Sequence, residues 1–170
     1  MSTFEHKKEA PKEVKCKVVT VSDTRDQETD KSGKLMIQLL EEAGHSIADY
    51  VIVKDETASI REAVLKGCED PNIDAVLTNG GTGIALRDVT IETVRELFDK
   101  EMDGFGELFR MLSYTEDIGS AAILSRAAAG SVNHTAVFST PGSSGAVRLA
   151  MNKLILPELG HVVRELKKDL

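Results

Sequence analysis

The stretch of the sequence that most suggests chemistry is residues 78–92, TNGGTGIALRDVTIE, in which three glycines are followed by an arginine and an aspartate. Gly80, Gly81 and Gly83 allow positive φ angles and close backbone approach to a ligand, and Thr82 adds a hydroxyl group. The spacing matches neither the P-loop nor the G-x-G-x-x-G dinucleotide motif. The residues favour a ligand-binding loop, although a plain turn remains the alternative.

Two aspartates follow predicted strand ends. Asp88 lies just after the glycine loop, and Asp55 follows the apolar run at residues 46–53. Two carboxylates suit Mg²⁺, which prefers oxygen ligands and keeps several waters. Each aspartate also fits a structural role, since an acid near a helix N-terminus is stabilising. Spacing alone leaves both interpretations open.

Two further loops contain small and polar residues, SDTRDQETDKSG at residues 22–33 and TPGSSG at residues 140–145. The second precedes a predicted helix, so it is either an anion site or a Pro-Gly turn with serine caps. In an open α/β sheet, ligands bind at the carboxyl ends of strands, so we expect all three loops to converge on one site. From the first loop we expect contributions from Ser22, Asp23, Asp30, Ser32 and Gly33.

Short β-branched runs alternate with longer amphipathic runs along the chain, which predicts βα units on a mostly parallel sheet. Strands are predicted at residues 16–22, 46–53, 74–78 and 135–139. Helices are predicted at residues 34–43, 59–67, 90–98, 106–113, 121–129, 146–156 and 158–168, with a capping box at Ser59 and Glu62. Residues 1–15 are polar and predict a loose tail before a single domain at 16–170.

Composition excludes several classes of protein. The chain has 170 residues, 41% hydrophobic and 29% charged, which is typical of a soluble globular domain. Its net charge of −7 argues against binding nucleic acid, which needs a positive surface. Without a signal peptide or an apolar run that could span a bilayer, we expect a cytoplasmic protein with no membrane partner.

The cysteines and histidines show no metal-binding spacing. Cys16 and Cys68 are far apart and predict buried or incidental thiols. No zinc-ligand pattern links the histidines, so we expect surface positions for all of them: His6, His45, His134 and His161.

Five motifs occur in a specific order, VSDTRDQETDKSG, TNGGTGIALRDVT, DGFGELFRMLS, ILSRAAAG and TPGSSGAV. Together they resemble the MoaB/MogA family of molybdenum-cofactor biosynthesis proteins, which is similar to the G domain of gephyrin. The resemblance covers residues 18–159. It implies a three-layer α/β/α sandwich with a mostly parallel central sheet, assembled as a trimer or a hexamer.

The resemblance also implies an activity. The family binds molybdopterin and transfers AMP from ATP to its terminal phosphate, with Mg²⁺ required, before other cofactor-biosynthesis proteins insert the metal. Three possibilities remain at this point. The chain is either such an adenylyltransferase, a non-catalytic molybdopterin carrier, or an assembly scaffold.

The resemblance assigns roles position by position. It implies that Asp55 and Asp88 are the catalytic and Mg²⁺-associated aspartates. Three positions depart from the common pattern: Ile91 stands in place of a Pro, Thr140 in place of a Leu, and Ser144 in place of a second Pro. Losing that second Pro should leave the turn less rigid. The positions that match the family's ligand pocket are Gly80, Gly81, Thr82, Gly83, Glu107, Ser113, Ser125, Arg126, Pro141, Gly142 and Ser143.

Overall fold

A six-stranded sheet organises the chain, and the computed structural model describes residues 2–170 of it. The strand order is β2-β1-β3-β6-β5-β4. The pairs β2–β1, β1–β3 and β3–β6 are parallel, whereas β6–β5 and β5–β4 are antiparallel. The strands are β1 (Lys15–Val21), β2 (Ser46–Val53), β3 (Ala75–Asn79), β4 (Lys100–Glu101), β5 (Ala128–Val132) and β6 (Thr135–Thr140).

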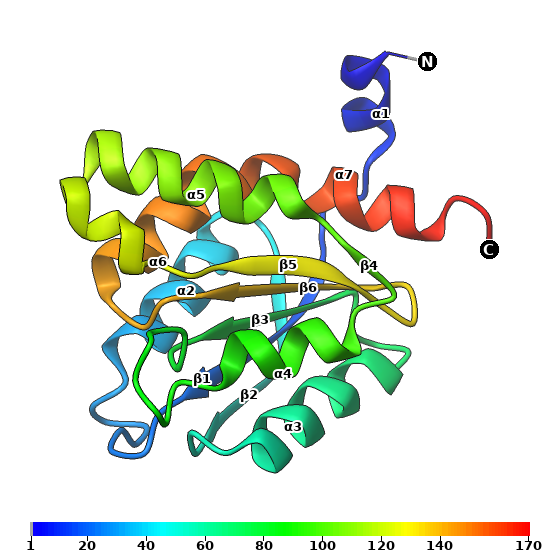
Figure 1. The fold of residues 1–170 in the computed structure, drawn as a ribbon. Coiled ribbons are helices and arrows are strands. Elements are labelled where there is room, and N and C mark those ends of the chain that lie inside the picture. Colours follow the sequence, from blue (N-terminus) through cyan, green and yellow to red (C-terminus); the bar gives the residue numbers. More distant parts are fainter. Residues whose placement is uncertain (1) are drawn as a thin grey trace.

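Helices cover both faces of this sheet, so the predicted three-layer α/β/α sandwich is confirmed (Figure 1). One face packs against α3 (Thr57–Glu69) and α4 (Thr90–Leu97). The other face packs against α2 (Lys31–Glu42), α5 (Asp103–Glu116), α6 (Ser144–Ala150) and α7 (Leu156–Lys167).

The central strands read as continuous apolar runs because both of their faces are covered. Every residue of β3 and β6 is buried, as are all of β1 after its first residue. That pattern is typical of parallel strands between two helical layers. Among the described residues, no helix has the length and apolar character to cross a membrane.

The predicted helix at residues 121–129 is wrong. A short 3₁₀ helix, η1 (Gly119–Leu124), is followed by strand β5. Alanine has the highest helix propensity, but propensity is only a weak preference, and tertiary packing overrides it here. Gly130 lies so close to its neighbours that a Cβ would sit 2.5 Å from Phe98 Cγ and 2.6 Å from the Lys100 carbonyl oxygen. The end of the Ala-rich run, from Ala128, is therefore part of a tightly packed strand.

Two helix starts also differ from prediction. The expected capping box at Ser59 and Glu62 is wrong, because α3 begins at Thr57 with Glu56 as its N-cap. Helix α5 begins at Asp103 and contains both glycines of the GFGE segment. Gly106 allows α5 to lie close to the chain beside it, since a Cβ there would be 2.6 Å from the Ala127 carbonyl oxygen.

The N-terminal segment needs a correction as well. Residues 1–15 were predicted to be a loose tail, but they contain helix α1 (Thr3–Glu9), capped by Ser2 and Glu5 in a capping box. Helix α1 packs on α7 (Figure 1). Glu9 accepts a hydrogen bond from Arg164 Nη2 at 2.6 Å, and Lys7 pairs with Glu158. Ion pairs with the C-terminal helix hold this segment in place. Such pairs join residues that are far apart in the sequence, so no local pattern could predict them.

A π-helical bulge connects the last two helices, α6 and α7. Residues Met151–Ile155 form a π-helical segment, η2, between α6 and α7. The buried side chains of Met151 and Ile155 face the core on the α2 side of the sheet.

Candidate functional site

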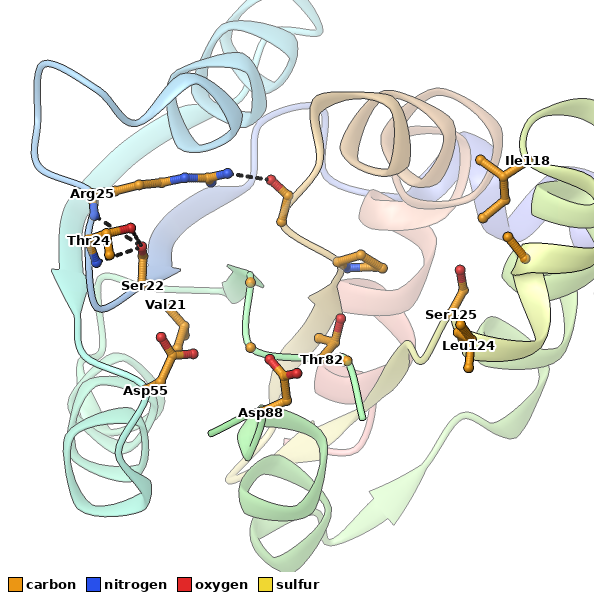
Figure 2. Close-up of a pocket in the computed structure, with 16 residues that line it drawn as sticks. Val21, Ser22, Thr24, Arg25, Asp55, Thr82, Asp88, Ile118, Leu124 and Ser125 are labelled. Carbon is orange, nitrogen blue, oxygen red and sulfur yellow. Dashed lines mark hydrogen bonds between the residues drawn. The ribbon is translucent and has the colours of Figure 1, made fainter. Parts of the chain in front are cut away.

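Three loops meet at the carboxyl ends of the adjacent parallel strands β1, β3 and β6 and enclose one open cavity of about 540 Å³. This is the convergence that the sequence predicted. Figure 2 shows Arg25 and Asp55 on one side of the cavity and Ile118 and Leu124 on the other. The lining residues are Val21, Ser22, Thr24, Arg25, Asp55, Gly80, Gly81, Thr82, Gly83, Asp88, Ile118, Ala121, Leu124, Ser125, Pro141 and Gly142.

The glycine loop crosses the end of β1 at very close range. Gly80 has φ 98° and Gly81 has φ 67°, both in the region that favours glycine. A Cβ on Gly80 would overlap the carbonyl oxygen of Val21. The Gly80 N–H donates to the Thr140 carbonyl at 3.0 Å, and the Gly80 carbonyl accepts from Thr90 Oγ1 at 2.9 Å. The glycines therefore let three strand ends come together.

Asp88 closes the turn that follows the glycine loop. Its Oδ2 accepts from the Ala85 N–H at 3.0 Å, and its own N–H donates to the Ala85 carbonyl at 3.0 Å. A Cβ on Gly83 would lie 2.6 Å from Asp88 Oδ2, so the carboxylate rests directly on the loop backbone. The side chain is fixed in position at the cavity wall (Figure 2).

Asp55 and Asp23 hold their two loops together by a reciprocal exchange. The Asp23 N–H donates to Asp55 Oδ2 at 2.9 Å, and the Asp55 N–H donates to Asp23 Oδ1 at 3.1 Å. Arg87 then binds Asp23 in a bidentate ion pair, with Nε to Oδ2 at 2.6 Å and Nη2 to Oδ1 at 2.9 Å. Asp23 is thus a positioning residue whose charge is already paired.

The two carboxylates of that pair differ in their electrostatics. The hydrogen bond from Arg87 lowers the pKa of Asp23. Burial raises the pKa of Asp55, and the nearby charges of Asp23 and Asp88 raise it further. Asp55 therefore sits in a surplus of negative charge, a place where a cation is favourable.

The residues present fit a Mg²⁺ ion that arrives with a nucleotide. Asp55 and Asp88 both lie against the glycine loop, since a Cβ on Gly81 would be 2.9 Å from Asp55 Oδ1 and a Cβ on Gly83 would be 2.6 Å from Asp88 Oδ2. Within residues 2–170, no third Asp, Glu, His or Cys side chain forms a metal-binding cluster with them. Mg²⁺ is commonly held by one or two carboxylates plus substrate phosphates and water, which suits this pair.

Arg25 is a site residue that the sequence-based prediction missed. Its Nη1 donates to Ser32 Oγ at 2.5 Å, and its Nη2 donates to the Gly142 carbonyl at 3.1 Å (Figure 2). It is the one cationic side chain among the described residues that line the cavity. Its position as the sole arginine of the loop at residues 22–33 was the available signal.

Other missed residues are apolar. Ile118, Ala121 and Leu124 form the wall opposite the carboxylates and come from η1 and the turn before it. No local pattern identified them: Ala121 and Leu124 fall in the helix predicted at residues 121–129, and Ile118 precedes it.

Six of the predicted pocket residues lie just outside the cavity lining. Asp30 caps α2 through the Gly33 N–H at 3.0 Å, and Ser32 donates to Asn79 Oδ1 at 2.8 Å, both buried beneath the first loop. Ser113 is buried within α5, and Ser143 caps α6. Gly33 packs against Asp30, and Asp23 holds Asp55 as described above.

The last two predicted residues have different positions. Arg126 supports the glycine loop from outside, donating to the carbonyl oxygens of Thr82 at 2.9 Å and Gly83 at 2.6 Å. Glu107 lies on α5 in a separate surface hollow beside Arg110. The structure therefore does not bring Glu107 to the cavity.

The chain as a whole is similar to known proteins. Residues 17–161 match the model of a family described as "Probable molybdopterin binding domain". Molybdenum cofactor biosynthesis protein B of Bacillus subtilis (strain 168) is 73% identical over 169 residues, covering 99% of this chain and 99% of that protein. The chain belongs to the MoaB/MogA family of molybdenum-cofactor biosynthesis proteins.

Solved structures of this family share its fold. A crystal structure of a molybdenum cofactor biosynthesis protein B has a TM-score of 0.92 and 66% identity, covering 94% of this chain and 99% of that chain. The tungsten cofactor synthesizing protein MoaB from Pyrococcus furiosus has a TM-score of 0.82 and 40% identity, covering 93% and 99%. The family resemblance carried by the five motifs is therefore confirmed.

Proposed function

We propose that the chain acts in molybdenum-cofactor biosynthesis by transferring AMP from ATP to the terminal phosphate of molybdopterin. An oxygen of that phosphate attacks the α-phosphorus of ATP. A new P–O bond forms while the bond to the β-phosphate oxygen breaks, and its electron pair leaves with pyrophosphate. The observation that supports this proposal is that Asp55 and Asp88 both lie against one glycine loop, inside a cavity with a polar and an apolar side.

The two sides of the cavity suit the two kinds of group in the substrates. Ile118 and Leu124 provide apolar surface for a flat ring, and Arg25 provides a guanidinium for phosphate oxygens on the opposite side. Arginine binds phosphate with planar, bidentate geometry. We propose that this arrangement, with an apolar wall opposite the guanidinium, determines the orientation of the bound substrates.

Positioning accounts for most of the catalysis in this scheme. A phosphate monoester is ionised near neutral pH and needs no general base, so the cavity requires no histidine or cysteine. Joining two polyanions is limited by orientation and by repulsion between charges. The glycine loop permits close approach of substrate to backbone, while Asp23 and Arg87 keep Asp55 in place.

Mg²⁺ would be held through Asp55 and Asp88 and, when bound, would offset the charge that develops on pyrophosphate. Asp88 is fixed by the Ala85 N–H, and Asp55 is fixed by the Asp23 N–H, so both carboxylates are oriented before substrate arrives. Preorganised groups of this kind need no rearrangement during the reaction.

The direct test is pyrophosphate release from purified protein with molybdopterin, Mg²⁺ and ATP. Asp88→Asn should lower the rate by about 100- to 1,000-fold, the usual loss for one preorganised electrostatic group. Asp169→Asn, a change at the exposed C-terminal end, is the matched control and should leave the rate intact. Undiminished release by Asp88→Asn would refute the assignment.

A molybdopterin carrier is the second candidate, and the turn at residues 140–144 favours it. Ser144 replaces a proline there, and the turn is held instead by the Arg25 bond to the Gly142 carbonyl. A carrier would bind molybdopterin saturably and release no pyrophosphate in the same assay. That result would support molybdopterin binding in the cavity and refute the transfer of AMP.

We further propose a homo-oligomer, a trimer or a hexamer, formed through the outer face of α5. Leu108, Met111 and Tyr114 recur along this helix and are 46%, 54% and 60% exposed. Exposed apolar surface of this kind commonly marks an interface. Light scattering should give three or six times the 18.4 kDa chain mass. Met111→Glu should lower the assembly state, whereas Leu170→Glu at the C-terminus should not.

A further inference from the structure

Two histidines and a glutamate meet where the N-terminal helix docks on the C-terminal helix. His6 lies on α1, and His161 and Glu165 lie on α7. One ligand atom from each of the three lies within 4.8 Å of the others. This cluster is at the α1–α7 contact, away from the loops of the candidate site (Figure 1). No spacing in the sequence indicates this cluster, because His6 and His161 are far apart along the chain.

The geometry around His161 leaves one ring nitrogen available to a metal. Its Nδ1 lies 3.0 Å from Glu158 Oε2, a contact that favours the tautomer with the proton on Nδ1. The Nε2 lone pair is then free. Histidines that bind metals usually donate their other ring N–H to a carboxylate in this way. Glu158 therefore orients His161 from behind.

His6 and Glu165 complete the donor set. The two imidazole rings meet edge to face with centroids 5.8 Å apart, and His6 Nδ1 lies 3.3 Å from Glu165 Oε1. The side chains of His6 and His161 are 26% and 22% exposed, so both are shielded yet reachable from solvent. Two imidazoles and one carboxylate match the protein ligands of open zinc sites, with water in the fourth position.

The charges around the cluster are already paired with one another, and this pairing limits its affinity for a metal ion. Glu165 also binds Arg164 Nη1 and Lys168 Nζ, each at 2.8 Å, and a metal must compete with these cations. Glu9 and Glu158 add negative charge nearby and pair with Arg164 and Lys7. We therefore expect micromolar binding, weaker than in a closed structural zinc site.

We propose that His6, His161 and Glu165 bind a divalent transition-metal ion, with Zn²⁺ the best match, and that the ion fastens α1 to α7. The imidazole donors select against Mg²⁺ and Ca²⁺, which take oxygen ligands. The segment that follows α1 already lies close to α7, since a Cβ on Gly160 would lie 2.8 Å from the Pro11 carbonyl oxygen. A bound ion would add a bridge between the two ends of the chain.

The other soft ligands of the chain do not compete for this ion. Cys16 and Cys68 are free and buried. Burial also raises the pKa of each thiol to about 12, which keeps both protonated and poor metal ligands. The cluster is also independent of AMP transfer, so its test does not depend on the proposed function.

The first measurement is Zn²⁺ binding by competition with a chromophoric chelator. The wild-type protein should bind one ion more tightly than His6→Gln or His161→Gln, by about tenfold or more, the usual loss for a disturbed ligand set. His134→Gln, in the hairpin between β5 and β6, is the matched control and should bind like wild type. Equal affinity in all four proteins would overturn the proposal.

The second measurement reports the place of binding. Zn²⁺ should slow hydrogen exchange of the backbone amides of α1 in wild type and in His134→Gln. His161→Gln should abolish this protection although the substituted residue lies on α7. Zinc protection of α1 that survives in His161→Gln would overturn the proposal. Circular dichroism of each variant without zinc checks that it is folded.

Discussion

Replacing Gly80 with alanine should destabilise the fold sharply, because this glycine lies where three strand ends meet. Gly80 has φ 98°, beyond the left-handed region that other residues tolerate. A side chain held in such a conformation costs about 1–3 kcal/mol. The new Cβ would also overlap the Val21 carbonyl oxygen, which is backbone at the end of a central strand and cannot rotate away.

The two effects together should exceed about 3 kcal/mol. For a chain of this size, each kcal/mol lowers Tm by about 2–4 °C, so a loss of at least about 6 °C is expected. The Gly80 N–H bond to Thr140 would weaken as the loop moves, so activity should fall too.

Gly104→Ala is the matched control. Gly104 lies in the first turn of α5, and a Cβ there has no heavy atom within 4 Å. Alanine should raise stability by up to about 1 kcal/mol through its better helix propensity. Thermal melts followed by circular dichroism measure both variants. A Gly80→Ala protein that melts with wild type, or a Gly104→Ala protein that melts as low as Gly80→Ala, would refute this account of the loop.

Three further predictions follow from the electrostatics and burial of the chain. Burial raises the pKa of Asp55 in the folded state, so ionised Asp55 costs stability at neutral pH. Asp55→Asn should therefore raise Tm at pH 7, with an advantage that disappears as the pH falls below 3.8, the ordinary pKa of an aspartate, while pyrophosphate release is lost. An advantage that grows as the pH falls would contradict this sign. Arg25→Lys should raise KM for ATP or molybdopterin by about tenfold, because lysine cannot bind both Ser32 and Gly142 as the planar guanidinium does. KM values equal to those of wild type would show that Arg25 does not contact the substrates. Cys16 and Cys68, with the pKa of each thiol raised to about 12 by burial, should resist a thiol reagent at pH 8 until urea unfolds the chain, and rapid labelling of the native protein would show an opening that the fold does not predict.

Local patterns predicted the elements whose stability depends on their own sequence. The apolar runs of β1, β2, β3 and β6 and the amphipathic period of α2 and α4 were predicted near their observed positions. The glycine loop and Asp88 could be located as well, because glycine spacing and a following acid are local signals. Since parallel strands end at one edge of a sheet, these local signals also predicted that the three loops would line one cavity.

Partners that are distant in sequence decided the rest. The run at residues 121–129 became η1 and β5 because Gly130 packs against Phe98 and Lys100, and α1 is ordered by charges on α7. Glu107 matched a family motif, yet the direction of α5 places it outside the cavity.

The arrangement of charges in the site also depends on the tertiary structure. The sequence shows Asp23 and Asp55 as similar acids after strands. Only the fold pairs Arg87 directly with Asp23 and places Asp55 near the negative charges of Asp23 and Asp88. It likewise turns Arg25 from an ordinary loop residue into the cation of the cavity. Residue type and spacing determined which groups the chain carries to the sheet edge. Which of them are paired, and which are left to bind a ligand, depends on Coulomb and hydrogen-bond contacts between segments that only folding brings together.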